Sequence, residues 1–224
     1  MFTRIFVSAL FAGMAAGLIA ALLQLVFVQP LLLHAELYET GALEHFGALT
    51  DVPAQQNTGG IDPIRDGLSI GVTMVIYSGF ALVMMAIMAQ AELRGVRIDA
   101  RTGLLWGAAG FVAVQLAPGF SLAPEVPGVA AADLAARQIW WVSTVIAAAV
   151  AMGLFAFGRN WGAWGLACAL LLAPHLIGAP EPDTFAGPVP TEIGALFAAR
   201  SLGVSMVAWV LLGSFCGYFW QRNG

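Results

Sequence analysis

The sequence predicts an all-α membrane protein, a six-transmembrane helix bundle with two short, proline-broken helices and a parallel two-helix repeat. Hydrophobic residues make up 60% of the 224 residues and charged residues only 10%, whereas an average soluble domain has about 25% charged residues. The mean hydropathy is +0.85, and the apolar residues are concentrated in six segments separated by polar loops. A ten-residue pattern also occurs twice, 56 positions apart. These observations indicate one integral membrane domain over residues 1–224.

The first predicted helix covers residues 2–33. No charged residue occurs in the 29 positions that follow Arg4, while the apolar part of a signal peptide has only about 7–15 residues. We therefore expect this segment to be retained as a transmembrane helix. It contains Gly13-x-x-x-Gly17, a small-residue spacing that lets two helices approach closely. A polar outer loop is expected at residues 34–66.

Five further apolar segments complete the predicted bundle. They cover residues 67–90, 103–121, 138–157, 162–178 and 193–220. The third and fifth helices are interrupted by Pro118 and Pro174, and their uninterrupted parts are shorter than the roughly 20 residues that a full span requires. Because proline removes a backbone donor, these helices must continue past a kink or end inside the membrane. Irregular backbone at that depth is tolerated only where protein or a water-filled cavity covers it.

The distribution of arginine predicts the orientation, because cytoplasmic loops carry an excess of basic residues. All nine basic residues are arginine. With the N-terminus inside, six of them are cytoplasmic: Arg4, Arg94, Arg97, Arg101, Arg159 and Arg222. Of the thirteen acidic residues, only Glu92 and Asp99 fall on that side. Both termini are therefore expected in the cytoplasm. A five-helix alternative, without the helix at 162–178, would place Arg222 outside.

An internal repeat is indicated by the pattern L-A-P-x4-A-P-E, which begins at Leu116 and again at Leu172. The same offset carries the start of the helix at 138–157 onto the start of the helix at 193–220. The two hairpins therefore look like two copies of one unit in the same orientation. Parallel repeats build several transporter folds, with binding sites near the repeat interface. The alternative is a chance match, since Ala and Pro are frequent in this chain.

The predicted outer side collects side chains that bind divalent metals. All three histidines and eleven of the thirteen acidic residues are expected there, and imidazole with carboxylate suits cobalt, nickel and zinc. We take five residues as candidate metal ligands: His34, Glu36, Glu39, His175 and Glu181. The alternative is an acidic, solvated loop surface in which the histidines serve as interfacial anchors.

Helix geometry limits which of these ligands can act together. Residues three or four apart share a helix face, whereas residues two apart do not. His34 would therefore share a face with Tyr38, and Glu36 with Glu39. His34 and Glu36 would converge only if the helix had ended before them.

Other side chains within the spans can have a functional or a structural role. Arg200 lies about 10 Å inside the last predicted helix at 1.5 Å per residue, where it can mark a functional site, snorkel outward or pair with Glu192. Met84 and Met88 have ligand atoms that suit Cu(I), but methionines at helical spacing more often pack. The motifs of P-loop ATPases, zinc proteases, serine hydrolases and C-x-x-C redox proteins are missing. We therefore expect no enzymatic activity and no cofactor.

Three stretches of the sequence are distinctive, namely residues 2–39, 116–128 and 173–180. They resemble the CbtA family of predicted cobalt transporter proteins. The run P-H-L-I-G-A-P and the first-helix exit L-H-A-E-L-Y-E are the most specific parts, and the resemblance covers the whole chain. It implies a cobalt uptake protein of the bacterial inner membrane, tied to cobalamin biosynthesis, and a small partner subunit with a histidine-rich tail. The family is usually described with five spans, one fewer than the residues predict.

The leading functional prediction is the membrane subunit of a divalent metal uptake transporter, with cobalt(II) as the ion that moves inward through the bundle. The five candidate ligands would form its outer mouth. The alternative is a membrane scaffold or assembly partner for a separate metal-binding subunit, without a translocation path of its own. A polar path across the bundle would favour the transporter, and a dry, fully packed bundle the scaffold. A membrane enzyme with a buried polar pocket is a third possibility.

Overall fold

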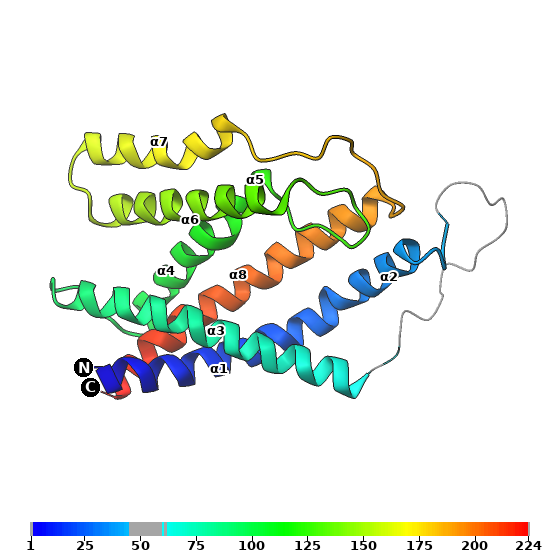
Figure 1. Ribbon diagram of the computed structural model, residues 1–224. Coiled ribbons are helices and arrows are strands. Elements are labelled where there is room, and N and C mark those ends of the chain that lie inside the picture. Colours follow the sequence, from blue (N-terminus) through cyan, green and yellow to red (C-terminus); the bar gives the residue numbers. More distant parts are fainter. Residues whose placement is uncertain (1, 45–59, 61, 224) are drawn as a thin grey trace. The chain divides into compact units, whose positions relative to one another are not determined.

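The computed structural model describes residues 2–44, 60 and 62–223, and these residues form helices and loops without strands (Figure 1). In chain order the helices are α1 (Phe2–Phe27), α2 (Gln29–Glu39), α3 (Pro63–Glu92), α4 (Ala100–Phe111), the π-helix η1 (Val112–Leu116), α5 (Ala117–Ser121), α6 (Leu134–Phe157), α7 (Trp161–Ile177) and α8 (Thr191–Arg222). The predicted all-α membrane class is confirmed, because the described part of the chain has five helical segments long and apolar enough to cross a membrane. These are α1, α3, the continuous segment Ala100–Ser121, α6 and α8. The fifth predicted span, at 162–178, corresponds to α7, an apolar helix of only 17 residues.

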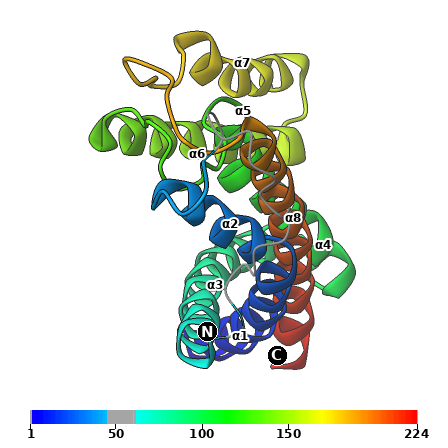
Figure 2. The same cartoon turned by 90° about the vertical axis from the view of Figure 1, so that its right-hand side faces the viewer.

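The helices form two compact units. Unit 1 contains α1 up to Val26, α3, α4 and the part of α8 from Gly203 onward. Unit 2 contains α2, η1, α5, α6, α7 and the first part of α8, up to Leu202. Within unit 2, α6 and α7 run side by side in both ribbon views (Figure 1, Figure 2).

The buried face of α1, in unit 1, is built from small side chains. Helix α1 buries only small residues, namely Ser8, Ala9, Ala12, Gly13, Ala16, Gly17, Ala20 and Ala21. Its large side chains point outward, and Phe6 and Phe11 are 48% and 55% exposed. This pattern is expected in lipid, where large apolar side chains gain nothing from burial and small ones let backbones approach. A Cβ on Gly17 would lie 2.6 Å from the Cα of Met74 on α3, so the predicted close approach at this motif is confirmed.

A second glycine seam joins α4 to α8. Gly103 and Gly107 on α4 face Gly213 on α8, and Gly217 on α8 lies against the backbone of Asp99 just before α4. A Cβ on Gly213 would lie only 2.7 Å from the Cα of Gly107, and one on Gly107 would lie 2.8 Å from the Cα of Val210. Real Cβ atoms essentially never come within 3.0 Å of backbone atoms. The two helices are therefore in backbone contact, and no side chain larger than hydrogen fits along the seam.

The start of α1 and the end of α8 lie together within unit 1 (Figure 1). They meet at the side chain of Trp220, which is buried. The guanidinium of Arg4 lies 3.9 Å above the indole ring, and its Nη2 donates to the carbonyl of Trp220 at 2.7 Å. The indole Nε1–H donates to Oε1 of Glu92 at 2.9 Å. Asn223 donates to Oγ of Ser8 at 2.9 Å. These contacts connect α1 and α8, and Glu92 adds the end of α3.

The first helix differs from the prediction of one continuous segment at 2–33. It is interrupted at Val28, and α2 begins at Gln29. Pro30 explains the interruption, because it has no N–H and its ring clashes with the carbonyl four residues earlier. The N–H groups of Leu31 and Leu32 both donate to the carbonyl of Val28, at 3.1 and 3.2 Å, and restart the helix.

The predicted outer loop at 34–66 is also corrected at both ends. Helix α2 continues to Glu39, and α3 begins at Pro63. Side-chain capping explains the early start of α3, since Asp62 accepts hydrogen bonds from the N–H groups of Ile64 and Arg65 at 2.9 and 3.1 Å. Asp133 caps α6 in the same way, so that helix begins four residues before the predicted position 138.

Neither Pro118 nor Pro174 ends its helix where it stands. The helix that begins at Ala100 widens into η1 immediately before Ala117 and continues to Ser121. A π-turn is a common way to absorb a residue that cannot donate a helical hydrogen bond. Helix α7 runs through Pro174 and ends at Ile177. The predicted proline breaks are therefore continuous helical segments with local adjustments.

Candidate metal-binding region of unit 2

All five predicted ligands lie in unit 2. Three of them are on α2, because that helix continues past its predicted end. His34 and Glu36 are partly buried, and Glu39 is exposed. The rings of His34 and Tyr38 are 5.6 Å apart, which confirms that they share a face. Since the helix has not ended, His34 and Glu36 are two positions apart on a helix and point in different directions.

A small apolar cluster fixes the position of α2. Ala35 is fully buried against Val126 and Val189, and Tyr38 packs against the same cluster. Val126 and Val189 come from the two segments that follow the repeated motif. The last turn of α2 also packs against the first of these segments, since a Cβ on Gly128 would lie 3.1 Å from Cβ of Glu39. The backbone at Glu39 is therefore held by packing, and its carboxylate remains exposed.

His175 lies in the last turn of α7 and is held by residues of α5 and α6. Its Nδ1 is 2.7 Å from Oγ of Ser121. Its ring packs edge-on against Phe120 and Trp140, with centroids 5.2 and 6.0 Å away. The indole Nε1–H of Trp140 in turn donates to the carbonyl of Pro174 at 3.2 Å. These contacts fix the imidazole in orientation.

The hydrogen bond to Ser121 leaves the other ring nitrogen available. In the described part of the chain, Nε2 of His175 has no hydrogen-bond partner. If Nδ1 carries the proton and donates to Ser121, Nε2 has a free lone pair. Histidines that bind metals are usually oriented in this way, by a hydrogen bond from the nitrogen that does not bind. Sequence reasoning does not identify Ser121, Phe120 and Trp140 as neighbours of His175; the only signal is that Ser121 and Phe120 lie in the first copy of the repeated motif.

The structure does not bring the five candidates into one cluster. Glu181 is exposed in the segment after α7. The contacts of His175 come from α5 and α6, while the ring contact of His34 comes from its own helix. Among the described residues, no group of three or more His, Cys, Asp or Glu side chains could hold a metal ion. His45 lies outside the described residues. The five-residue site therefore stays a prediction.

The two copies of the repeated motif have the same local structure. Their helices end at Ser121 and Ile177, and the following N–H groups donate to the carbonyls of Pro118 and Pro174, at 2.9 and 3.1 Å. The two helix ends are separated by 56 positions, the same offset as that between the two copies of the sequence pattern. The segments that follow pack on each other, with Gly187 against Val129. The repeat is thus present in local conformation as well as in sequence.

Unit 2 is strongly acidic. It contains three arginines and nine acidic residues, a net charge of −6, whereas unit 1 has six arginines and four acidic residues. Arg137 is paired with Glu125 at 2.8 Å.

Arg200 donates to the carbonyl of Phe27 at 3.3 Å. That carbonyl lacks its usual helical donor, because Leu31 bonds to Val28 instead. Arg200 thus serves the interrupted end of α1, not the predicted pairing with Glu192.

Comparison with known proteins supports the family assignment. No curated protein and no solved structure gives a significant match to the chain. The family model described as "Probable cobalt transporter subunit (CbtA)" matches residues 2–221, nearly the whole chain. The resemblance found in the sequence is therefore confirmed, and with it a membrane subunit of a cobalt transport system. The chain belongs to the CbtA family.

Proposed function

We propose that the chain transports a divalent metal ion, cobalt(II), inward through its helices, and that unit 2 collects the ion. The observation that carries the proposal is the charge of unit 2, which has a net charge of −6 and also contains His34 and His175. A surface of one sign raises the local concentration of its counter-ion. Carboxylate and imidazole together are suitable ligands for cobalt(II). In this proposal the chain acts in transport and not as an enzyme.

The proposed ligands are His34, Glu36, Glu39, His175 and Glu181. His175 is the best supported of them, because Ser121 and two aromatic rings hold its imidazole with Nε2 available. Convergence of the α2 ligands with His175 would require the ion to draw them together. Such a site would bind the ion weakly, and weak binding suits an ion that must be released inward, since very tight binding would oppose release.

The proposed setting is the inner membrane of a bacterium, with both termini in the cytoplasm. Helix α7 would also cross the membrane, as the fifth of six spans in chain order and the shortest of them. A small partner subunit with a histidine-rich tail would deliver or receive the ion, and the transported cobalt would supply cobalamin biosynthesis. Family membership supports a partner, because the family is described as a transporter subunit.

Radiocobalt uptake tests the proposal. Cells expressing this chain together with its neighbouring genes should accumulate more cobalt than cells with an empty vector, and cells expressing the chain alone show whether it needs its partner. The double variant His34→Ala/His175→Ala should lose most of the uptake while the amount of protein in the membrane stays the same. Asp51→Ala, which changes an acid of the predicted outer loop outside the described residues, is the matched control and should have no effect.

A second variant separates the metal role of His175 from its packing. Ser121→Ala removes the hydrogen bond to Nδ1 but keeps the imidazole, so uptake should fall by about 10-fold or more, as expected for loss of an orienting partner. Full uptake by the His34→Ala/His175→Ala variant would reject the proposed site. Uptake that needs the chain but is unaffected by every ligand variant would favour a scaffold for a separate metal-binding subunit.

A further inference from the structure

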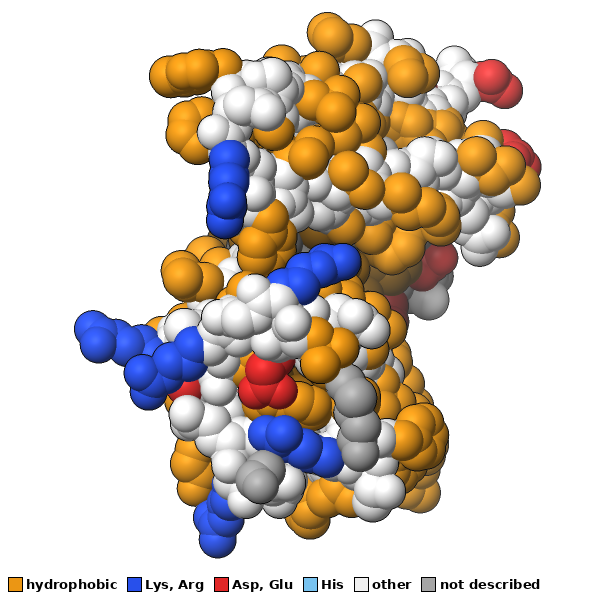
Figure 3. Space-filling model, turned by 90° about the vertical axis from the view of Figure 1, so that its left-hand side faces the viewer, with side chains coloured by type: hydrophobic (Ala, Val, Ile, Leu, Met, Phe, Trp, Pro, Cys, Tyr) orange, Lys and Arg blue, Asp and Glu red, His pale blue; other side chains and the backbone are white. Residues whose placement is uncertain are grey.

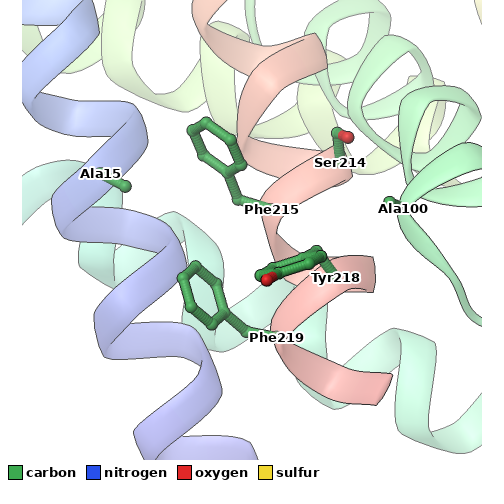
Figure 4. Close-up of a pocket in the computed structure, with 6 residues that line it drawn as sticks. All are labelled: Ala15, Ala100, Ser214, Phe215, Tyr218 and Phe219. Atoms are coloured by element: carbon green, nitrogen blue, oxygen red, sulfur yellow. The ribbon is translucent and has the colours of Figure 1, made fainter. Parts of the chain in front are cut away.

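An apolar groove opens on unit 1, between α1, α4 and α8, with a volume of about 290 Å³ (Figure 4). It is lined by Ala15, Ala100, Ser214, Phe215, Tyr218 and Phe219. In Figure 4 the rings of Phe215 and Phe219 project from α8 toward α1, and Ala15 and Ala100 approach from the neighbouring helices. The lining is almost entirely hydrocarbon, so an apolar chain is the occupant that it suits.

Arginines surround this end of unit 1. Arg222 reaches the rim of the groove, where its Nη1 donates to the hydroxyl of Tyr218 at 3.1 Å. Arg101 follows the lining residue Ala100 and is exposed. Arg94 is exposed as well, and neither Arg94 nor Arg101 forms a salt bridge within the described residues. Figure 3 looks at this end and shows several arginine side chains with few acidic ones.

The two acidic residues at this end are already engaged. Glu92 accepts the indole N–H of Trp220. Asp99 accepts from the backbone N–H groups of Thr102 and Arg101, at 2.8 and 2.9 Å, and pairs with Arg97 at 2.9 Å. The hydrogen bond from the Thr102 backbone is the main cause that lowers the pKa of Asp99 from its usual value of 3.8. Neither acid is available to neutralise Arg101 or Arg222.

We propose that this groove binds one anionic phospholipid. The acyl chain would lie against Phe215 and Phe219, and the phosphate would lie between Arg101 and Arg222. Guanidinium groups bind phosphate oxygens in a bidentate manner, and basic pockets between transmembrane helices bind anionic head groups. A zwitterionic head group also has a phosphate, but its ammonium would be placed among the arginines. Charge complementarity therefore selects the anionic lipid.

Native mass spectrometry of the full-length protein in detergent tests this inference. Phosphatidylglycerol and phosphatidylcholine with identical acyl chains are added in separate titrations. We expect phosphatidylglycerol to remain bound in one copy at concentrations at which phosphatidylcholine does not. Arg101→Gln/Arg222→Gln should remove this preference, with a loss of about fivefold in affinity for each arginine. Arg159→Gln, which changes an exposed arginine of unit 2, is the matched control and should keep the preference.

A groove variant tests the acyl chain separately. Ala15→Leu fills the groove and should weaken binding of both lipids, while the arginines remain in place. The single variants Arg101→Gln and Arg222→Gln provide the same test if the double variant does not fold, and each should lose part of the preference. Equal binding of the two lipids by the unchanged protein would overturn the proposal, as would full selectivity in the arginine variants.

Discussion

Ala130 donates its backbone N–H to the carbonyl of Ala186 at 2.8 Å, and the two residues are 56 positions apart in the chain. They lie in the segments that follow the two copies of the repeated motif and are related by the same offset as those copies. Contact between equivalent positions is what a local rotation axis produces, because the same surface of each copy then meets its counterpart. The duplicated segments are therefore paired with each other in unit 2.

The first prediction concerns the full extent of the repeat. In an experimental structure, residues 103–158 should superpose on residues 159–214 by a rotation about an axis near the membrane normal. Pro118 should coincide with Pro174, and Pro124 with Pro180. Cryo-electron microscopy of the protein in nanodiscs would measure this. Unrelated packing of the two hairpins would mean that the repeat is confined to the motif and its helix ends.

The second prediction uses the glycine seam between α4 and α8. Gly213→Ala should destabilise the protein by about 1–3 kcal/mol, because the new methyl group would strike the backbone of α4 and force the helices apart. Gly203→Ala, in the same helix, is the control, since a Cβ there has nothing within 4 Å. It should be neutral or stabilising, as alanine is the better helix former. Thermal unfolding in detergent, followed by size-exclusion chromatography, compares the two variants.

The third prediction concerns topology. In a background with Cys168→Ala and Cys216→Ala, single cysteines at Asp133 and Asp183 should react with an impermeant thiol reagent from outside. A cysteine at Asn57, outside the described residues, should react as well. Cysteines at Arg97 and Asn223 should react only after the membrane is opened. Labelling of the Asn223 site in intact cells would mean that α7 does not cross and that the chain has five spans.

The fourth prediction concerns Trp220, which is 1% exposed. Trp220→Phe removes the hydrogen bond to Glu92 and weakens the contact with Arg4, so the free energy of unfolding should fall by about 1–3 kcal/mol. Trp161→Phe, at a tryptophan that is 83% exposed, should change it little. A double-mutant cycle with Glu92→Ala, which removes the acceptor, measures the hydrogen bond. Additive losses in that cycle would show that the indole contributes only by packing.

Much of the fold can be predicted because it depends on composition over about 20 residues. The apolar segments predict the helices, and Gly13 and Gly17 predict a helix contact that the structure confirms. Composition does not predict the interruption of the first helix at Val28, although Pro30 is present in the sequence. The absence of charge predicts one continuous helix there, whereas the steric effect of a single proline divides it.

The candidate site is harder to predict, because it depends on contacts between distant segments. The pairing of His34 with Tyr38 follows from helix spacing alone. The contact of His175 with Ser121, across 54 positions, has no spacing rule behind it. The sequence predicts that the first helix ends before His34, which would let the side chains of His34 and Glu36 converge. In the structure α2 continues through both residues, so the two side chains point in different directions. Local geometry is therefore predictable, and the environment of each ligand is not.

The glycine seams determine which positions of this chain can change over evolutionary time. In a soluble protein, buried positions exchange one large apolar residue for another. Here Gly13 and Gly17 of α1 and the glycines of the α4–α8 seam cannot grow by a methyl group, while the outward-facing Phe6 and Phe11 only have to remain apolar. Distant relatives should therefore be recognised by the spacing of glycine and alanine more readily than by their bulky residues.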